Sequence, residues 1–245
     1  MFKTFLENLL KEFINKALDA GLKIALELNN TNKDLYIKHT LGAGGDISIG
    51  ADLISEQIFI ESLSEFGNID SEESGFIDNN RQHTIIIDPL DGSDNFLSNI
   101  PYYGASIAIP SLDIGIIMNF CNLNAIVHSE NKNFCGTLAQ DFSEFKELIA
   151  LNTSKCGIFE GAYSNPNICS LLASSNIKFR SLGALALSLG LVYNVSFVLF
   201  CGKKRKYDLE AGYLISKNLY KIENKKLALI SKDKNLFDNI AKLLF

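Results

Sequence analysis

A run of apolar residues that ends in carboxylates constrains this chain more than any other stretch. The segment Ile85-Ile86-Ile87-Asp88-Pro89-Leu90-Asp91-Gly92-Ser93-Asp94-Asn95-Phe96 begins with β-branched residues, which favour a buried strand. The strand is predicted to stop at Asp88, where Pro89 fixes one backbone angle and Gly92 allows conformations closed to other residues. Because residues three apart on a regular strand face opposite sides, a turn is needed to point Asp88 and Asp91 at one place.

The residues after this turn suit the binding of an anion. Residues 92–95 are predicted to open a helix, whose first backbone N–H groups have no partner within the helix. These groups would point back toward the carboxylates and favour a negative charge. Carboxylates on one side and amides on the other describe a pocket for hard cations bridged to a phosphate.

The composition excludes several classes of protein. The 245 residues are 47% hydrophobic and 21% charged, which is normal for a chain that folds around one or two cores. A net charge of −5 gives no general attraction to a nucleic acid polymer or to an anionic membrane. Charged residues interrupt the apolar N-terminal region, which argues against a signal peptide or a membrane span. Five cysteines without a Cys-x-x-Cys pair are expected to be reduced thiols, which suggests a cytoplasmic protein.

Apolar periodicity divides the chain into two predicted parts, residues 1–140 and 141–245. The first is expected to be an α+β domain that carries the main metal site. The second alternates helices and strands, as is typical of an α/β layer, and completes the site. Helices are predicted over residues 2–28, 51–66, 142–151, 167–174, 184–193, 208–218 and 234–244, and strands near residues 67–75, 85–88, 103–110, 114–120, 125–128, 157–163, 178–181, 195–200, 219–222 and 227–231.

Acidic side chains lie near the ends of several predicted elements. Glu72 and Glu73 end one candidate strand, and the turn at Asp88 ends the next. If these strands are neighbours, their carboxylates converge. Asp208 lies at the start of a predicted helix, where an aspartate is also an ordinary cap. A candidate site for two or three Mg²⁺ ions, which prefer oxygen ligands, is therefore formed by Glu72, Asp88, Asp91 and Asp208.

These motifs resemble those of a known family. The Asp88-Pro89-Leu90-Asp91-Gly92-Ser93 run, the preceding pair Glu72-Glu73 and the later Asp208-Leu209-Glu210-Ala211-Gly212 segment look like the signatures of the inositol monophosphatase and fructose-1,6-bisphosphatase superfamily. Their order along the chain is also that of the family, and the first motif is highly specific. The resemblance implies an α/β (α+β) fold, a layered α/β/α/β/α sandwich that is commonly a homodimer, and a Mg²⁺-dependent phosphatase.

The resemblance also implies roles for individual residues. Glu72 and the pair formed by Asp52 and Ser93 would orient and deprotonate a water molecule that attacks the phosphate directly. The backbone amides of Gly92 and Ser93 would hold the phosphate. The implied metal ligands are Glu72, Asp88, the carbonyl group of Leu90, Asp91 and Asp208.

Two further segments are candidates for contacts with the rest of the substrate. Arg180, Gly183 and Ala184 belong to a segment that resembles the family's substrate-contacting helix start, although Ala184 replaces the usual Ser or Thr. Cys201 stands where inositol phosphatases commonly carry an acid for the inositol hydroxyl groups, which speaks against inositol. The basic run Lys203-Lys204-Arg205-Lys206 is either a solvated loop or a site where its first two residues hold a second phosphate.

Several functions therefore remain open. Inositol monophosphate is the default substrate of the family, whereas fructose-1,6-bisphosphate and 3′-phosphoadenosine 5′-phosphate suit the basic run better. A non-enzymatic alternative is a phosphate- or metal-sensing protein on the same fold. Gathered carboxylates argue against it, because like charges destabilise a fold without cations. An aspartyl-phosphate mechanism is disfavoured because two residues, rather than one, separate Asp88 from Asp91, and no His-Glu-x-x-His zinc motif is present.

Overall fold

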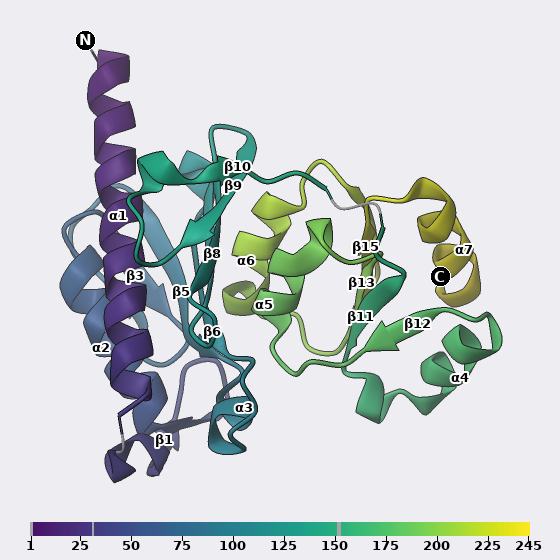
Figure 1. Cartoon of the computed structure of the whole chain (residues 1–245). Coiled ribbons are helices and arrows are strands. Elements are labelled where there is room, and N and C mark those ends of the chain that lie inside the picture. The colour runs from purple at the N-terminus through teal and green to yellow at the C-terminus, as the bar shows by residue number, and fades with distance from the viewer. Residues whose placement is uncertain (1, 31, 151–152) are drawn as a thin grey trace.

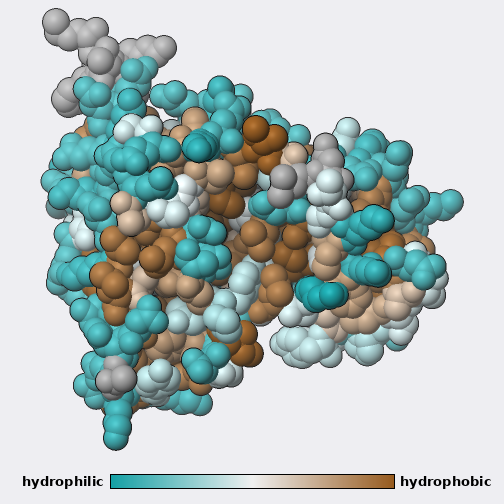
Figure 2. Space-filling model, viewed as in Figure 1, coloured by the Kyte–Doolittle hydropathy of each residue, from teal (hydrophilic) through white to brown (hydrophobic). Residues whose placement is uncertain are grey.

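The computed structural model describes residues 2–30, 32–150 and 153–245 and places them in five layers (Figure 1). Helices cover the outer face of an eight-stranded sheet, further helices separate it from a five-stranded sheet, and a last pair covers that second sheet. The α/β/α/β/α sandwich expected from the sequence is confirmed. The face in Figure 2 is furrowed between the larger and the smaller part of the molecule, and hydrophobic residues lie along the furrow.

Three helical layers enclose the two sheets. The N-terminal helix is amphipathic, so one of its sides packs on the larger sheet while the other faces solvent. The helix over Leu185–Gly190 contacts strands of both sheets, and the helix over Lys206–Ile215 packs on it and on the larger sheet, so this middle layer joins the two halves. In order, the layers contain α1 (Phe2–Leu28) with α2 (Gly50–Leu63), then α5 (Leu185–Gly190) with α6 (Lys206–Ile215), and finally α4 (Pro166–Ser174) with α7 (Lys234–Leu244); the short α3 (Ser93–Leu97) follows the central strand.

The larger sheet has the strand order β10-β9-β8-β7-β6-β5-β3-β4. Its strands β3 and β5 are parallel, and all other neighbouring pairs are antiparallel. The strands are β3 (Asn68–Ser71), β4 (Gly75–Ile77), β5 (Thr84–Asp91), β6 (Gly104–Ile109), β7 (Ile114–Asn119), β8 (Asn124–Ser129), β9 (Lys132–Thr137) and β10 (Lys146–Glu147).

The smaller sheet has the order β12-β11-β13-β15-β14, with β11 parallel to both of its neighbours. A separate hairpin of β1 (Lys38–Leu41) and β2 (Ile47–Ile49) precedes α2. The strands of the smaller sheet are β11 (Cys156–Glu160), β12 (Lys178–Arg180), β13 (Val198–Cys201), β14 (Tyr220–Glu223) and β15 (Leu227–Ser231), and short 3₁₀ helices span Lys33–Tyr36, Pro110–Leu112, Phe142–Glu144, Ala162–Ser164 and Leu191–Tyr193.

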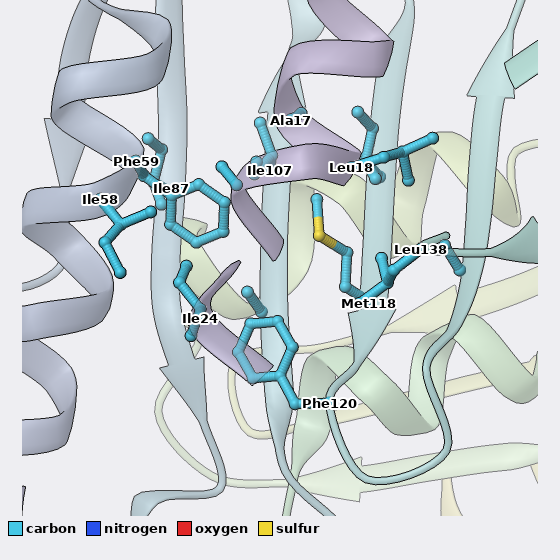
Figure 3. Packing of buried hydrophobic residues seen from close by; sticks show 14 of the residues in the cluster. Ala17, Leu18, Ile24, Ile58, Phe59, Ile87, Ile107, Met118, Phe120 and Leu138 are labelled. Carbon is cyan, nitrogen blue, oxygen red and sulfur yellow. The ribbon is translucent and has the colours of Figure 1, made fainter. Parts of the chain in front are cut away.

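The core under α1 and α2 determines which way the central strand faces. Figure 3 shows Leu18 and Ile24 of α1 and Phe59 of α2 gathered around Ile87 and Ile107 of the sheet. Burial of large apolar side chains stabilises such a core by about 1.5–3 kcal/mol each. Because side chains alternate along a strand, the residue after Ile87 must point to the opposite face, toward α5 and α6.

β5 does not stop at Asp88, as the sequence predicted, but continues to Asp91. In the pairing with β6, Asp88 lies opposite Ser106. Three residues later Asp91 lies opposite Gly104, only two positions along β6, so β5 carries one extra residue. Such a β-bulge shifts the alternation of side chains by one position, and it accommodates Pro89, which has no N–H group to donate. Asp88 and Asp91 therefore leave the strand on the same side, without the predicted turn.

The prediction of a helix over residues 142–151 is wrong. Phe142–Glu144 form a 3₁₀ helix and Lys146–Glu147 form β10; residue 151 lies outside the described residues. The strand β9 before it was not predicted. The ring of Phe142 packs edge-on against Phe134 of β9, with 5.5 Å between ring centroids. This apolar residue thus packs on the rim of the sheet and does not form one face of a helix. The larger sheet thus extends past residue 140, and the domain boundary there stays a prediction.

We expect Gly104→Ala to destabilise the fold by about 3 kcal/mol, the upper end of the usual cost of overpacking. A Cβ atom at Gly104 would lie 1.8 Å from the carbonyl oxygen of Met118, so β6 and β7 would have to separate opposite Asp91. Urea denaturation measures the change. Gly202→Ala is the matched control, since nothing lies within 4 Å of a Cβ atom there; equal stability of the two variants would contradict the steric argument.

Candidate metal and phosphate site

Three buried carboxylates meet at the end of β3, within β5 and in the first turn of α6. Glu72, Asp88 and Asp208 each offer an oxygen, and these oxygens all lie within 4.8 Å of one another. We call them the carboxylate trio. Their residues are exposed by only 8%, 3% and 3%, respectively. Mutually close, buried carboxylate oxygens are a donor set that fits divalent cations such as Mg²⁺.

The pairing of β3 with β5 brings the first two members of the trio together. The strands are neighbours, as the convergence of their carboxylates required, and they run in parallel. The register continues one residue past β3, where the N–H group of Glu72 donates to the carbonyl oxygen of Ile87 at 3.0 Å. Because Ser71 pairs with Ile87 in this parallel register, the next residues, Glu72 and Asp88, lie side by side.

Helix α6 supplies the third member. Asp208 lies in the first turn of α6, which packs on β5 and β6. The hydroxyl group of Ser106 on β6 donates to the carbonyl oxygen of Tyr207 at 2.6 Å and so fixes the start of the helix against the sheet. Asp208 therefore reaches the trio from a segment more than a hundred residues away in the sequence.

Asp91 is close to the trio but is engaged with α5. Its two oxygens accept the N–H groups of Leu185 and Leu187 at 3.1 and 3.0 Å. A carboxylate at a helix N-terminus satisfies free amides and interacts favourably with the helix dipole. Asp91 is not among the three residues whose oxygens lie within 4.8 Å of one another. The carbonyl group of Leu90, the other predicted ligand on β5, belongs to the buried residue between Asp91 and Pro89.

Glu160 is a buried carboxylate that the sequence analysis did not single out. From the end of β11 it accepts the N–H groups of Leu182 and Gly183 at 3.2 and 3.0 Å and the hydroxyl group of Ser188 at 2.6 Å. It thus fixes the loop before α5 in the way that Asp91 fixes the helix itself. The position of Glu160 at the carboxyl end of a parallel strand was the available signal.

Arg205 enters the site, which the sequence analysis did not predict. Its guanidinium donates to both carboxylate oxygens of Asp208, at 2.8 and 3.1 Å, and also to Glu72 and Asp46. The basic run was recognised, but its third residue rather than its first lies among the carboxylates. An arginine three residues before an aspartate in the first turn of a helix can reach forward to it, and this spacing was the signal that was missed.

The three residues predicted to orient and deprotonate water, Glu72, Asp52 and Ser93, line a small cavity of about 50 Å³ beside the trio. Asp52 accepts the N–H group of Ile49 at 2.7 Å and so caps α2. Asp52 and Ser93 both line this cavity together with Glu72 and Glu73, but no hydrogen bond joins Asp52 to Ser93 among the described residues. The predicted set of Glu72, Asp52 and Ser93 is thus brought together, with the hydroxyl group of Ser93 not paired to Asp52.

A larger cavity of about 430 Å³ opens next to it. Gly92 has φ +86°, and a Cβ atom there would lie 3.0 Å from the carbonyl oxygen of Tyr102, so a glycine is needed where the chain approaches the cavity. Of the predicted substrate residues, those that line this cavity are Gly92, Ser93, Gly183 and Lys203.

The other predicted substrate residues do not line the larger cavity. Ala184 is buried, with 1% of its surface exposed. The Arg180 guanidinium is exposed and donates to the carbonyl oxygen of Phe179 at 2.8 Å. Lys204 points away and pairs with Glu223 at 2.7 Å.

Burial changes the proton affinity of the site. It raises the pKa of Glu72 from 4.5 to about 8, against the lowering effect of Arg205, and it raises the pKa of Asp52 from 3.8 to about 7. Burial and then the charges of neighbouring carboxylates also raise the pKa values of Asp88 and Asp91 well above the ordinary range. The metal-free site is therefore a cluster that binds protons or cations.

Fold and site together define the class of protein: a layered α/β sandwich with a buried carboxylate pocket between its sheets. The profile of the inositol monophosphatase family matches residues 6–218. The chain therefore belongs to the inositol monophosphatase family. Among the described helices, none combines the length and the apolar character needed to cross a membrane.

Two curated relatives are similar in sequence over part of their length, and a solved structure is similar in fold. A fructose-1,6-bisphosphatase of Pyrococcus furiosus is 40% identical over 70 residues, which are 28% of this chain and 28% of the relative. A bifunctional NADP phosphatase/NAD kinase of Methanococcus maripaludis is 25% identical over 237 residues, covering 82% of this chain and 42% of the relative. The crystal structure of the extragenic suppressor protein suhB from Bartonella henselae is similar with a TM-score of 0.77 and 20% identity, over 94% of this chain and 97% of that one.

We expect the metal-free protein to lose stability as the pH rises from 5.5 to 8.5. Glu72 and Asp52 bind a proton more tightly in the folded than in the unfolded chain, so their stabilising contribution is complete at low pH and is lost up to about pH 8. At about 1.4 kcal/mol per pKa unit, the two groups together should lower the free energy of unfolding by roughly 5 kcal/mol over this range. Urea denaturation in EDTA at the two pH values measures this fall, and stability that rises with pH would contradict it.

Proposed function

We propose that this protein is a Mg²⁺-dependent phosphatase that hydrolyses a small phosphate monoester by direct attack of water. The observation that carries the proposal is the convergence of Glu72, Asp88 and Asp208, whose oxygens lie within 4.8 Å of one another in a buried pocket. Buried like charges destabilise a fold unless a cation compensates them. Membership of the inositol monophosphatase family supports the same conclusion.

The carboxylate trio would hold the metal, with Asp91 and the carbonyl group of Leu90 as further ligands and two or three Mg²⁺ ions as the predicted number. Bound Mg²⁺ supplies positive charge for the phosphate oxygens and lowers the pKa of a water molecule. Asp91 holds α5 while it borders the pocket, so it would act both as a ligand and as the residue that positions this helix.

Glu72 is the proposed general base. Glu72 lines the small cavity beside the trio, where its carboxylate would accept the proton of the attacking water. Asp52 and Ser93 line the same cavity and would orient the attacking water. The amides of Gly92 and Ser93, at the start of α3, would bind the phosphate as hydrogen-bond donors.

The larger cavity supports a substrate that carries a second phosphate. Its volume of about 430 Å³ accommodates a phosphorylated sugar or nucleotide. Lys203 lines it and donates to the carbonyl oxygen of Gly44 at 3.2 Å, so its ammonium group lies at the cavity wall. Cys201, which stands where an inositol-binding acid is common in the family, lines it as well. A sugar or nucleotide bisphosphate is therefore favoured over inositol monophosphate.

We expect Asp88→Asn to reduce phosphate release at least about 100-fold, because it removes a charged oxygen from the trio and so about 2.7 kcal/mol or more of transition-state stabilisation. The asparagine oxygen can still accept the N–H group of Leu90, which Asp88 accepts at 3.1 Å, so the fold is retained. Release is measured with and without Mg²⁺ from fructose-1,6-bisphosphate, 3′-phosphoadenosine 5′-phosphate and inositol 1-phosphate.

Asp113→Asn is the control for this variant. Asp113 lies in the turn between β6 and β7, at the end of these strands away from the trio, and pairs there with Lys217 and His128. Its substitution should therefore leave phosphate release near the wild-type rate. If the wild type releases phosphate from none of the three substrates, the phosphate- or metal-sensing alternative is favoured instead.

Lys203→Gln should raise KM about tenfold for either bisphosphate and leave KM for inositol 1-phosphate nearly unchanged, because a charged hydrogen bond to the second phosphate is lost. Lys204→Gln tests the adjacent candidate. Its ammonium group is held by Glu223 and by the carbonyl oxygen of Asn224, so a smaller change is expected. An equal increase for all three substrates would assign Lys203 to another role.

The remaining expectations concern location and assembly. The protein is proposed to be a cytoplasmic homodimer that binds neither a nucleic acid polymer nor a membrane. Its net charge of −5 supports the last two points. Light scattering of the purified protein tests the dimer.

A further inference from the structure

Arg205 lies among the residues proposed to bind metal, although its own charge is positive. Its guanidinium grips both carboxylate oxygens of Asp208 through Nε and Nη2, at 2.8 and 3.1 Å. Through Nη1 it also donates to Glu72 and to Asp46. Two of these three partners belong to the carboxylate trio. A two-point pairing of this kind is among the strongest between a cation and a carboxylate.

We infer that Arg205 is an internal counter-ion that a metal ion must displace, and that it thereby sets the affinity of the site for Mg²⁺. The inference rests on the proposed function, because it requires Mg²⁺ to bind the carboxylate trio. In the metal-free protein, the guanidinium compensates part of the negative charge that Glu72, Asp88 and Asp208 bury. The contacts of Arg205 that stabilise the metal-free protein therefore lower its affinity for Mg²⁺.

The guanidinium and a metal ion need the same oxygens. Mg²⁺ draws its oxygen ligands to about 2.0–2.1 Å, whereas the N–H groups of Arg205 hold the oxygens of Asp208 at 2.8 and 3.1 Å. Two positive charges within a few ångströms of each other also repel strongly at a half-buried position. Because one oxygen set cannot serve both cations, metal binding costs the contacts that Arg205 makes with Glu72 and Asp208.

Displacement of Arg205 also affects the loop between β1 and β2. Asp46 lies in this loop, and its carboxylate is joined to the guanidinium of Arg205. Lys203 holds the same loop through the carbonyl oxygen of Gly44 at 3.2 Å. The Nη1 group that donates to Glu72 also donates to Asp46, so a guanidinium that leaves the trio would alter one of these two links between the loop and the segment that leads into α6. Because Gly44 and Asp46 of this loop line both cavities, metal binding would also alter the cavity walls.

Arg205→Gln tests the inference by titration of Mg²⁺ into the full chain, freed of metal with EDTA and followed by calorimetry. The variant should bind Mg²⁺ at least about tenfold more tightly than the wild type, a change of about 1.4 kcal/mol, because no guanidinium has to leave. It should also melt at a lower temperature than the wild type in EDTA. That difference should narrow in saturating Mg²⁺, since the ion then compensates the carboxylates in both proteins.

Lys206→Gln is the matched control. It removes the same charge from the next residue, whose ammonium group pairs with Asp70 instead of the trio. In 0.15 M salt its effect on Mg²⁺ affinity should stay within about twofold, because charges outside the pocket are largely screened.

The outcomes separate the inference from the proposed function. Affinity of Arg205→Gln equal to or below that of the wild type overturns the role of Arg205, and so does an equal gain in Lys206→Gln. Where the wild type binds Mg²⁺ without a gain in the variant, only the inference is lost. Where neither protein binds Mg²⁺, the proposed metal-dependent function is lost as well.

Discussion

One extra residue in β5 determines where the acidic groups of this protein lie. The hydrophobic core under α1 and α2 holds Ile87 on one face of the sheet, so Asp88 lies on the other face, toward α5 and α6. The bulge around Pro89 brings Asp91 to the same face as Asp88. Without the bulge, Asp91 would point toward the apolar core. The cap on α5 and the shape of the pocket all depend on this local irregularity in an otherwise regular sheet.

The electrostatic conflict at the site is the main constraint that the fold has to accommodate. Burial raises the pKa values of Glu72, Asp88 and Asp91, which means that the folded chain tolerates their charges poorly. Protons, the guanidinium of Arg205 and divalent ions are three ways to compensate the same charge. The charge and the proton affinity of the site therefore depend on which of these three compensates its carboxylates.

Much of this could be predicted from local sequence, and the rest depended on distant contacts. The acids after β3 and in β5 were found because an apolar run gives way to carboxylates, proline and glycine, and Asp208 because it lies at the start of a helix. The extent of β5 was missed because a bulge looks like a turn in sequence. The side-chain direction of Arg205 was missed because it depends on carboxylates more than a hundred residues away, such as Glu72.

Helix α5 has a further consequence for how the molecule works. Its amides are held from one side by Asp91 of the larger sheet, and the loop before it from the other side by Glu160 of the smaller sheet. The seam between the two halves and the carboxylate pocket are therefore one structure. Any hinge motion of one half against the other would pull on a carboxylate beside the pocket, so closure around a ligand and alignment of the charged groups are mechanically coupled.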